Sequence, residues 1–221
     1  MIRPNQDAIN KLVELYQSGN LEEAETKAKE LLNQFPNEIT VLNILAEIQD
    51  GKGQTEEAIK TYEKALQVNL NSPETHFNLG LVFHRLGRNK EANTSYQKAI
   101  SLKPDFINAY FNLGLVYQNV QEYKKATENY QKAIELQPNF HEAIGALGTT
   151  LQAQGKLEEA IQCYQKALSI QPDAKNHFNL DAGFRTHGSL DLAIEHFEKS
   201  LSIDDKNFHA LTSLGDALWN K

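Results

Sequence analysis

Seven histidines and one cysteine are among the side chains in this sequence that could bind a transition metal or act as nucleophiles. A zinc site needs several such ligands at short, regular spacing, but no two of the histidines are paired at that spacing on one helix. A single cysteine, Cys163, excludes an intrachain disulfide and any Cys-X-X-Cys motif. We therefore expect no metal site, and we interpret Cys163 as an unreactive thiol on the side of a helix. The histidines are His76, His84, His141, His177, His187, His196 and His209.

Motifs of the common catalytic and nucleotide-binding sites do not occur in the chain. There is no Gly-X-Gly-X-X-Gly or Gly-X4-Gly-Lys loop, no His-Glu-X-X-His and no serine-centred nucleophile motif. Aspartate and glutamate are plentiful, but they are spread over helix surfaces and caps. The sequence therefore predicts a protein that is not an enzyme and has no cofactor.

Asparagines recur at one repeating position, and their amides could bind a polypeptide. Asn78 and Asn112 are separated by one repeat, Asn179 follows two repeats later, and Asn10 occupies the same position earlier in the chain. A side-chain amide offers both a donor and an acceptor, so it can pair with a peptide group of an extended ligand. The row is interrupted, because Ile44, Ala146 and Ser213 fill the remaining positions.

Apolar and basic side chains accompany these asparagines. Phe77, Phe111 and Phe178 precede them, and Leu81 and Leu115 follow one helical turn later. An exposed apolar strip of this kind usually marks an interaction site; the alternative is that these residues pack against a neighbouring helix. Positive charge on the same face comes from His84, Arg85 and Arg185. These side chains either favour an acidic segment of a ligand or are simply solvated.

A repeat period of about 34 residues positions all of these side chains. Gly80, Gly114 and Gly148 follow one another at this period, and Gly215 comes two repeats later. Columns of alanine and of aromatic residues keep the same register, which excludes a chance pattern. The columns are Ala24, Ala58, Ala92, Ala126, Ala160 and Ala193, and Tyr62, Tyr96, Tyr130, Tyr164 and Phe197.

Each repeat is predicted to be a hairpin of two helices. In the fourth repeat, Leu113 and Tyr117 lie four residues apart on a first helix, and Ala126 and Tyr130 do so on a second. Pro138 then ends the second helix, because proline lacks the backbone N–H and clashes with the preceding turn. We expect the small column residues to let the two helices approach and Tyr130 to fill the space toward the next hairpin. Such hairpins bury their apolar faces only by stacking on one another.

The columns resemble the signature of the tetratricopeptide repeat (TPR) family. This resemblance implies an all-α fold, a right-handed α-solenoid of stacked antiparallel hairpins, forming a single domain over residues 1–221. Six repeats and one extra helix account for the length, since 221/34 is 6.5. The predicted repeats cover residues 5–38, 39–72, 73–106, 107–140, 141–173 and 174–207, and the capping helix covers 208–221.

Two repeats depart from the pattern. The first has Leu12 in the glycine column and Ala28 in the aromatic column, which suits an end unit. In the sixth, the loop after Pro172 is one residue shorter and Asp181 stands at a usual glycine position. We interpret Asp181 as the sign of a locally splayed hairpin rather than of a polar site.

The TPR resemblance implies a protein-protein interaction scaffold. The asparagine row is similar to the ladder in the TPR region of O-GlcNAc transferase, which grips a polypeptide backbone; the implied ligand is an extended peptide or helix in the concave groove. The carboxylate clamp of chaperone-binding TPR proteins is not expected, because Phe77, Leu81 and Phe111 fill its positions. An alternative follows from the first repeat, which resembles TPR regions that precede bacterial glycosyl-, sulfo- or methyltransferase domains. The chain would then be a substrate-recruiting or oligomerising arm, and self-association through the solenoid ends is a third possibility.

Charge and hydropathy narrow the class of partner. The net charge is 22 − 29 = −7, and no basic run offers a face for nucleic acid. Apolar runs are only a few residues long, far short of the about 20 residues needed to cross a bilayer. No secretory leader is recognisable after Met1. We therefore expect a cytoplasmic protein with a protein or peptide ligand and without membrane insertion.

Overall fold

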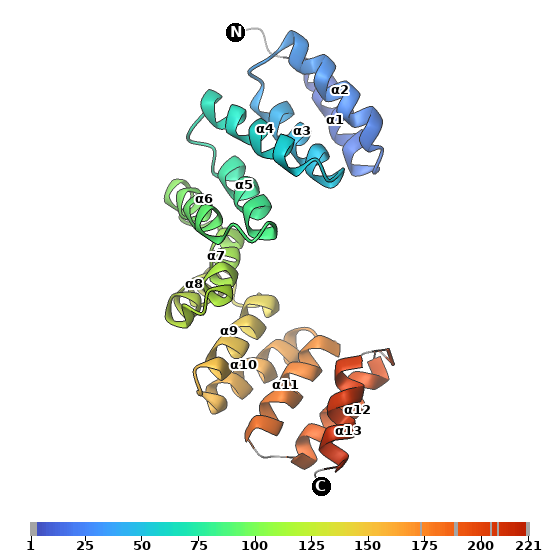
Figure 1. Cartoon of the computed structure of the whole chain (residues 1–221), viewed down its shortest axis with the longest axis vertical. Helices are drawn as coiled ribbons and strands as arrows, with labels where there is room; N and C mark the ends of the chain where they lie inside the picture. Colours follow the sequence, from blue (N-terminus) through green and yellow to red (C-terminus); the bar gives the residue numbers. More distant parts are fainter. Residues whose placement is uncertain (1–3, 173, 188–189, 204, 207, 220–221) are drawn as a thin grey trace. The chain divides into compact units, whose positions relative to one another are not determined.

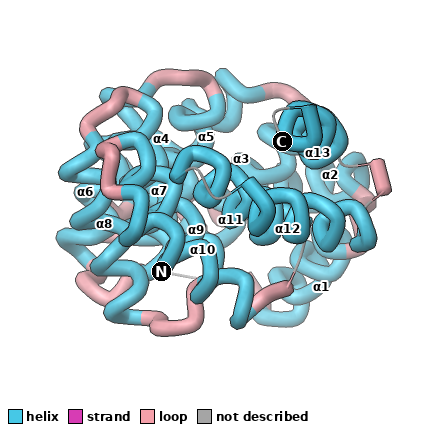
Figure 2. Tube along the Cα trace, turned by 90° about the horizontal axis from the view of Figure 1, so that it is seen from below, coloured by secondary structure: helices cyan, strands magenta, loops and turns pink. Residues whose placement is uncertain are grey.

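The structure is a computed structural model of the chain, and it describes residues 4–172, 174–187, 190–203, 205–206 and 208–219. Secondary structure in these residues consists of α-helices joined by short loops, without strands, which confirms the prediction of an all-α fold (Figures 1 and 2). The chain divides into two compact units, residues 1–109 and 110–221.

The N-terminal unit contains three helix hairpins and the start of a seventh helix. The first helices of the hairpins begin at residues 6, 39 and 73, at or next to the first residues of the predicted repeats. The helices are α1 (Gln6–Gln17), α2 (Leu21–Gln34), α3 (Ile39–Gly51), α4 (Thr55–Val68), α5 (Pro73–Arg85) and α6 (Asn89–Leu102), followed by α7 (Ile107–Asn119).

The C-terminal unit continues the same pattern. Helices α9, α11 and α13 begin at residues 141, 174 and 208, which are the first residues of the fifth and sixth predicted repeats and of the predicted capping helix. After α7, the helices are α8 (Tyr123–Leu136), α9 (His141–Ala153), α10 (Leu157–Ile170), α11 (Ala174–His187), α12 (Leu190–Ile203) and α13 (Phe208–Trp219).

Helix ends follow from local sequence. Ser72 caps α5, since its Oγ accepts a hydrogen bond from the Thr75 backbone N–H at 3.4 Å, and Pro73 occupies the first turn. The turns inside four hairpins place a glycine at positive φ, between 71° and 78°, which glycine adopts without steric cost. These glycines are Gly19, Gly53, Gly87 and Gly155.

The turn of the fourth hairpin has Gln121 at the same position, with a φ of 60°. A residue with a side chain is strained in this conformation, and glycine is not.

The glycine and tyrosine columns meet inside each hairpin. A Cβ added at Gly148 would lie 2.6 Å from Cε1 of Tyr164 and 3.2 Å from the backbone oxygen of Ala160. Tyrosine therefore covers the glycine of its own hairpin, a contact that our expectation of packing toward the next hairpin did not include. Tyr164 also reaches that next hairpin, because a Cβ at Gly183 would lie 3.2 Å from its Cδ2.

The first hairpin exchanges the sizes of the two columns. Leu12 stands in the glycine column of α1 and Ala28 in the aromatic column of α2, and both side chains are fully buried. A large residue on the first helix and a small one on the second fill the space that glycine and tyrosine fill elsewhere. The departure from the repeat pattern therefore preserves packing in the core.

Within each unit, helices pack on helices one or two places away in the chain. Neighbouring helices form the hairpins and the contacts between hairpins, and first helices such as α9 and α11 also touch directly. No helix in the described part of the chain is long and apolar enough to cross a membrane.

Candidate peptide-binding pocket

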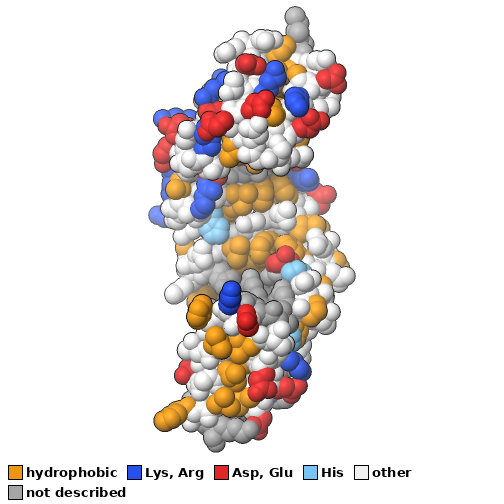
Figure 3. Space-filling model, turned by 90° about the vertical axis from the view of Figure 1, so that its right-hand side faces the viewer, with side chains coloured by type: hydrophobic (Ala, Val, Ile, Leu, Met, Phe, Trp, Pro, Cys, Tyr) orange, Lys and Arg blue, Asp and Glu red, His pale blue; other side chains and the backbone are white. Residues whose placement is uncertain are grey.

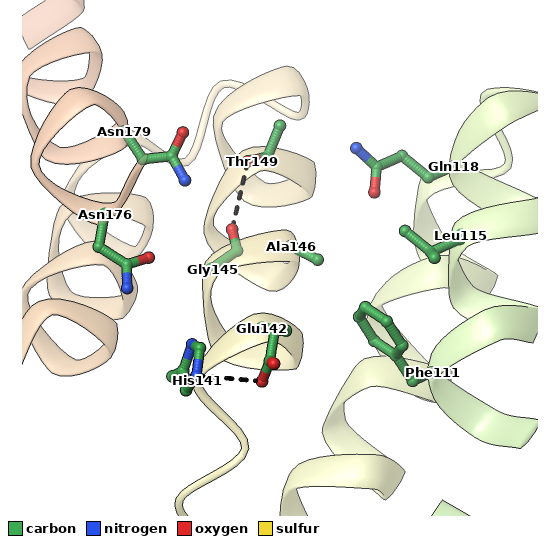
Figure 4. A pocket seen from close by; sticks show the side chains of 10 residues that line it. All are labelled: Phe111, Leu115, Gln118, His141, Glu142, Gly145, Ala146, Thr149, Asn176 and Asn179. Carbon is green, nitrogen blue, oxygen red and sulfur yellow. Dashed lines mark hydrogen bonds and ion pairs between the residues drawn. The ribbon is translucent and has the colours of Figure 1, made fainter. Parts of the chain in front are cut away.

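A pocket of about 530 Å³ lies among α7, α9 and α11, the first helices of three successive repeats in the C-terminal unit (Figure 4). We refer to it as the α7–α9–α11 pocket. Three of the predicted groove residues line it: Phe111, Leu115 and Asn179. The other lining residues are Gln118, His141, Glu142, Gly145, Ala146, Thr149 and Asn176.

Helix α7 supplies an apolar wall. The Phe111 ring packs against Tyr130 and Phe140, with ring centroids 6.0 and 5.0 Å apart, and remains half-buried. Leu115 lies one turn further along and is also half-buried. Gln118 completes this wall, and its Oε1 accepts a hydrogen bond of 2.6 Å from the Tyr130 hydroxyl. Phe111 and Gln118 are therefore held by contacts within the protein.

Helix α9 forms a floor of small residues. Gly145 and Ala146 lie side by side, and Ala146 occupies a position of the asparagine row. Thr149 stands one turn further along, where its Oγ donates to the carbonyl oxygen of Gly145 at 3.2 Å. The space above this part of α9 is therefore open, because neither Gly145 nor Ala146 carries a long side chain.

Helix α11 supplies amides on the opposite wall (Figure 4). Asn176 is 4% exposed and fixed in place, because its Nδ2 donates to the Gln171 carbonyl at 2.8 Å. Asn179 is half-buried, and the structure gives its amide no hydrogen-bond partner among the described residues. Its donor and acceptor are consequently available to a ligand.

The charged or ionisable side chains of the pocket lie at its end, where α9 begins. His141 Nε2 lies 3.4 Å from Glu142 Oε2 at the start of α9. The remaining lining residues are uncharged. The α7–α9–α11 pocket therefore favours a neutral segment of a ligand over a strongly charged one.

In the N-terminal unit, the predicted amide of Asn78 is engaged within the protein. Its Nδ2 donates to Oε1 of Glu47 on α3 at 2.7 Å. Burial raises the pKa of the Glu47 carboxyl, although hydrogen bonds from Tyr16 and Asn78 act in the opposite direction. A ligand that pairs with Asn78 must therefore compete with a carboxylate that the sequence analysis did not single out.

The other predicted residues of this unit have mixed surroundings. Phe77 packs between Tyr96 and Phe106, with centroids 5.7 and 4.8 Å away, as the packing alternative expects. Leu81 is 39% exposed, which leaves it accessible to a ligand. Arg85 forms an ion pair with Asp50. Burial lowers the pKa of His84, so this side chain adds no positive charge at neutral pH.

The remaining predicted groove residues are Asn112, Phe178 and Arg185. Asn112 is half-buried on α7, and Phe178 packs near Phe197 with centroids 6.5 Å apart. The side chains of Arg185 and Asp181 lie outside the described residues. Their predicted roles stay predictions.

Two glutamines that brace tyrosines of the core were not among the residues predicted from the sequence. Gln118 and Gln152 stand 12 residues before Tyr130 and Tyr164, and each accepts a hydrogen bond from that tyrosine, at 2.6 and 2.8 Å. The same position holds Asp50 before Tyr62 and His84 before Tyr96, so no column of glutamines could have revealed them. Glu47 and Asn176 likewise belong to no column of like residues.

Family patterns match most of the chain. The TPR repeat pattern matches residues 52–87 and 82–121, and two tetratricopeptide repeat patterns match residues 107–140, 141–174 and 11–67. No curated protein matches the chain significantly.

Solved structures of the same kind are numerous. MamA is 27% identical and has a TM-score of 0.67, over 76% of this chain and 91% of MamA. YrrB, a TPR protein with an unusual peptide-binding site, is 22% identical with a TM-score of 0.70, over 84% of this chain and 96% of YrrB. PilW, a type IV pilus biogenesis factor, is 20% identical with a TM-score of 0.84, over 96% of this chain and 100% of PilW. With its hairpins, its Gly–Tyr packing and these matches, the chain belongs to the tetratricopeptide repeat family.

Proposed function

We propose that this chain is a protein-interaction scaffold that binds an extended segment of a partner protein in the α7–α9–α11 pocket. The observation that carries the proposal is the Asn179 amide, which has no partner among the described residues and borders an open pocket. A backbone peptide group of the ligand would satisfy both its donor and its acceptor. The peptide-binding site named for the similar protein YrrB supports the same class of ligand.

The shape of the pocket indicates how the rest of the segment binds. Gly145 and Ala146 leave room for a ligand side chain, and Phe111 and Leu115 provide an apolar surface beside it. Burial of that side chain supplies affinity at roughly 25 cal/mol per Å² of apolar surface, and the amide fixes its register. The preferred ligand is thus an extended, uncharged segment with one large apolar residue.

The experiment begins with selection of peptides from a random library on the whole chain, followed by calorimetric titration of the best binder. We expect Ala146→Leu to weaken binding by about tenfold or more, because the new side chain fills the pocket. Asn179→Ala removes one hydrogen-bonding amide and should weaken binding by roughly fivefold, which corresponds to about 1 kcal/mol. Gln131→Ala is the matched control, since Gln131 is an exposed amide on the outside of α8.

Circular dichroism must show that all variants retain the helicity of the parent. Equal affinity of the parent and of Ala146→Leu for every selected peptide would refute the proposed pocket. A loss of affinity in Gln131→Ala equal to that in Asn179→Ala would refute the role of the Asn179 amide.

A further inference from the structure

A buried tyrosine holds the side-chain amide of Gln118 in one orientation. Tyr130 is fully buried, and its hydroxyl donates a hydrogen bond to Gln118 Oε1 at 2.6 Å. Burial raises the pKa of Tyr130, so the hydroxyl keeps its proton and acts as a donor at neutral pH. If the amide turned over, Nε2 would face this hydroxyl and the buried O–H would lose its acceptor, a loss that folded proteins avoid. The hydrogen bond therefore determines which end of the amide faces Tyr130.

The other end of the amide faces the α7–α9–α11 pocket. Gln118 lines this pocket and is half-buried. Figure 4 shows its amide extending from α7 toward α9, with the nitrogen on the side of the pocket. Nε2 carries two N–H groups, and the structure gives them no acceptor among the described residues. Gln118 therefore presents a hydrogen-bond donor to the pocket.

A second amide lies across the pocket. Asn179 on α11 stands on the far side of α9 from Gln118 (Figure 4), and Gly145 and Ala146 form the floor between them. The surface drawn in Figure 3 combines exposed hydrophobic side chains with uncharged polar side chains and backbone, and the pocket has the same combination. In an extended peptide, every side chain is flanked on both sides by a peptide group with a carbonyl acceptor. The two amides therefore suit the backbone on either side of a ligand side chain held above α9.

We propose that Gln118 is a specificity-determining contact of the pocket, donating from Nε2 to a peptide carbonyl of the ligand, and that Tyr130 is its positioning residue. This inference rests on the function proposed above for the pocket. It adds the chemical class of the group that α7 recognises, which must be an uncharged acceptor. Gln118 does not offer an acceptor in return, because its Oε1 already binds the Tyr130 hydroxyl.

An isosteric substitution tests the donor. The probe is the peptide of highest affinity selected from the random library on the parent chain, titrated by calorimetry against each whole-chain variant. Gln118→Glu keeps an oxygen for the Tyr130 hydroxyl, but it replaces the donor on the side of the pocket by a carboxylate oxygen, which only accepts. This oxygen would repel a peptide carbonyl of the ligand. We therefore expect affinity to fall by about tenfold or more at neutral pH.

Gln152 provides the matched control. It is half-buried like Gln118, and its Oε1 accepts a hydrogen bond of 2.8 Å from the Tyr164 hydroxyl, but it is not among the residues that line the pocket. Gln152→Glu places the same charge in the same kind of hydrogen bond, so the affinity should stay within about twofold of that of the parent. Circular dichroism and urea unfolding check that both glutamate variants fold.

A double-mutant cycle tests the positioning role of Tyr130. Tyr130→Phe removes the hydroxyl and keeps the ring against Gly114. The amide of Gln118 is then free to turn its oxygen toward the ligand, so we expect affinity to fall by roughly two- to fivefold. In the Gln118→Ala background the same substitution should have no further effect, because it acts through the amide that has been removed. A merely structural role of the hydroxyl would weaken binding equally in both backgrounds, and that result would overturn the role of Tyr130.

Ala146→Leu separates this inference from the proposed function. If Ala146→Leu weakens binding and Gln118→Glu does not, the pocket binds the peptide without a contact to Gln118, and only this inference is wrong. If neither variant weakens binding, the proposed function is wrong as well. An equal loss of affinity in Gln152→Glu and Gln118→Glu would show an effect of charge alone and would also overturn the inference.

Discussion

Gly145 and Gly148 stand one turn apart in α9 and provide a direct measure of the glycine–tyrosine packing. Replacing either by alanine adds one Cβ and the same gain in helix propensity, about 1 kcal/mol. At Gly145 the added atom would lie 3.7 Å from Asn176 Oδ1, an ordinary contact. At Gly148 it would lie 2.6 Å from Tyr164 Cε1, about 1 Å inside the usual separation of carbon atoms.

The ring of Tyr164 cannot move away at low cost. It is 2% exposed, and its hydroxyl donates to Gln152 at 2.8 Å. The backbone oxygen of Ala160, 3.2 Å from the same added atom, is also fixed within α10. Overpacking of this kind costs about 1–3 kcal/mol. Because the propensity gain cancels, we expect Gly148→Ala to be less stable than Gly145→Ala by that same amount.

Urea unfolding followed by far-UV circular dichroism measures the difference, and hydrogen exchange of the α9 amides shows whether it is local. Repeat proteins can unfold in stages, so the exchange data guard against a mixed transition. A double variant with Tyr164→Leu provides the control, since the smaller side chain should abolish most of the cost of Gly148→Ala. A difference below about 0.5 kcal/mol between the two single variants would refute the reasoning.

Two further predictions concern titratable groups. Burial raises the folded pKa of Glu47 above its ordinary 4.5, so its contribution to stability is full below that value and is lost as the pH rises through the folded pKa. We therefore expect the free energy of unfolding, measured by urea titration, to fall less for Glu47→Gln than for the parent when the pH is raised from acidic to neutral. Parallel falls of the two proteins over this pH range would contradict the prediction. Burial and the nearby Glu159 raise the pKa of Cys163. Iodoacetamide should therefore modify this thiol more slowly in the folded chain than in the chain unfolded by urea at the same pH. Equal rates would contradict the interpretation of Cys163 as an unreactive thiol.

The period of the sequence predicted the helices because packing in a repeat protein depends on columns of side chains. Glycine, alanine and aromatic columns placed the starts of α3, α5, α7, α9, α11 and α13 at the residues where the structure has them. The residues that the column tyrosines pack against were predicted incompletely. A column of tyrosines indicates that a large side chain is buried, but it does not show which helix that side chain contacts. The contact of Tyr164 with Gly148 of its own hairpin is visible only in the structure.

The candidate site was less predictable for a related reason. Phe111, Leu115 and Asn179 line the pocket, but the open volume depends on Gly145 and Ala146, where the sequence departs from its own pattern. A departure carries no periodic signal, so sequence analysis treated Ala146 only as an interruption of the asparagine row. Likewise, the bond from Asn78 to Glu47 joins α5 to α3 and is invisible without their relative placement.

Packing between near neighbours in the chain also bears on how the protein folds. Within each unit, the helices that touch are one or two places apart, so each contact closes a chain segment no longer than about one repeat. Short segments lose little entropy on closure, and proteins dominated by local contacts fold fast. Folding can consequently start at any hairpin and spread in either direction. A damaged hairpin would open by itself, so a mutation at one end of a unit should leave the amide protection of distant hairpins unchanged.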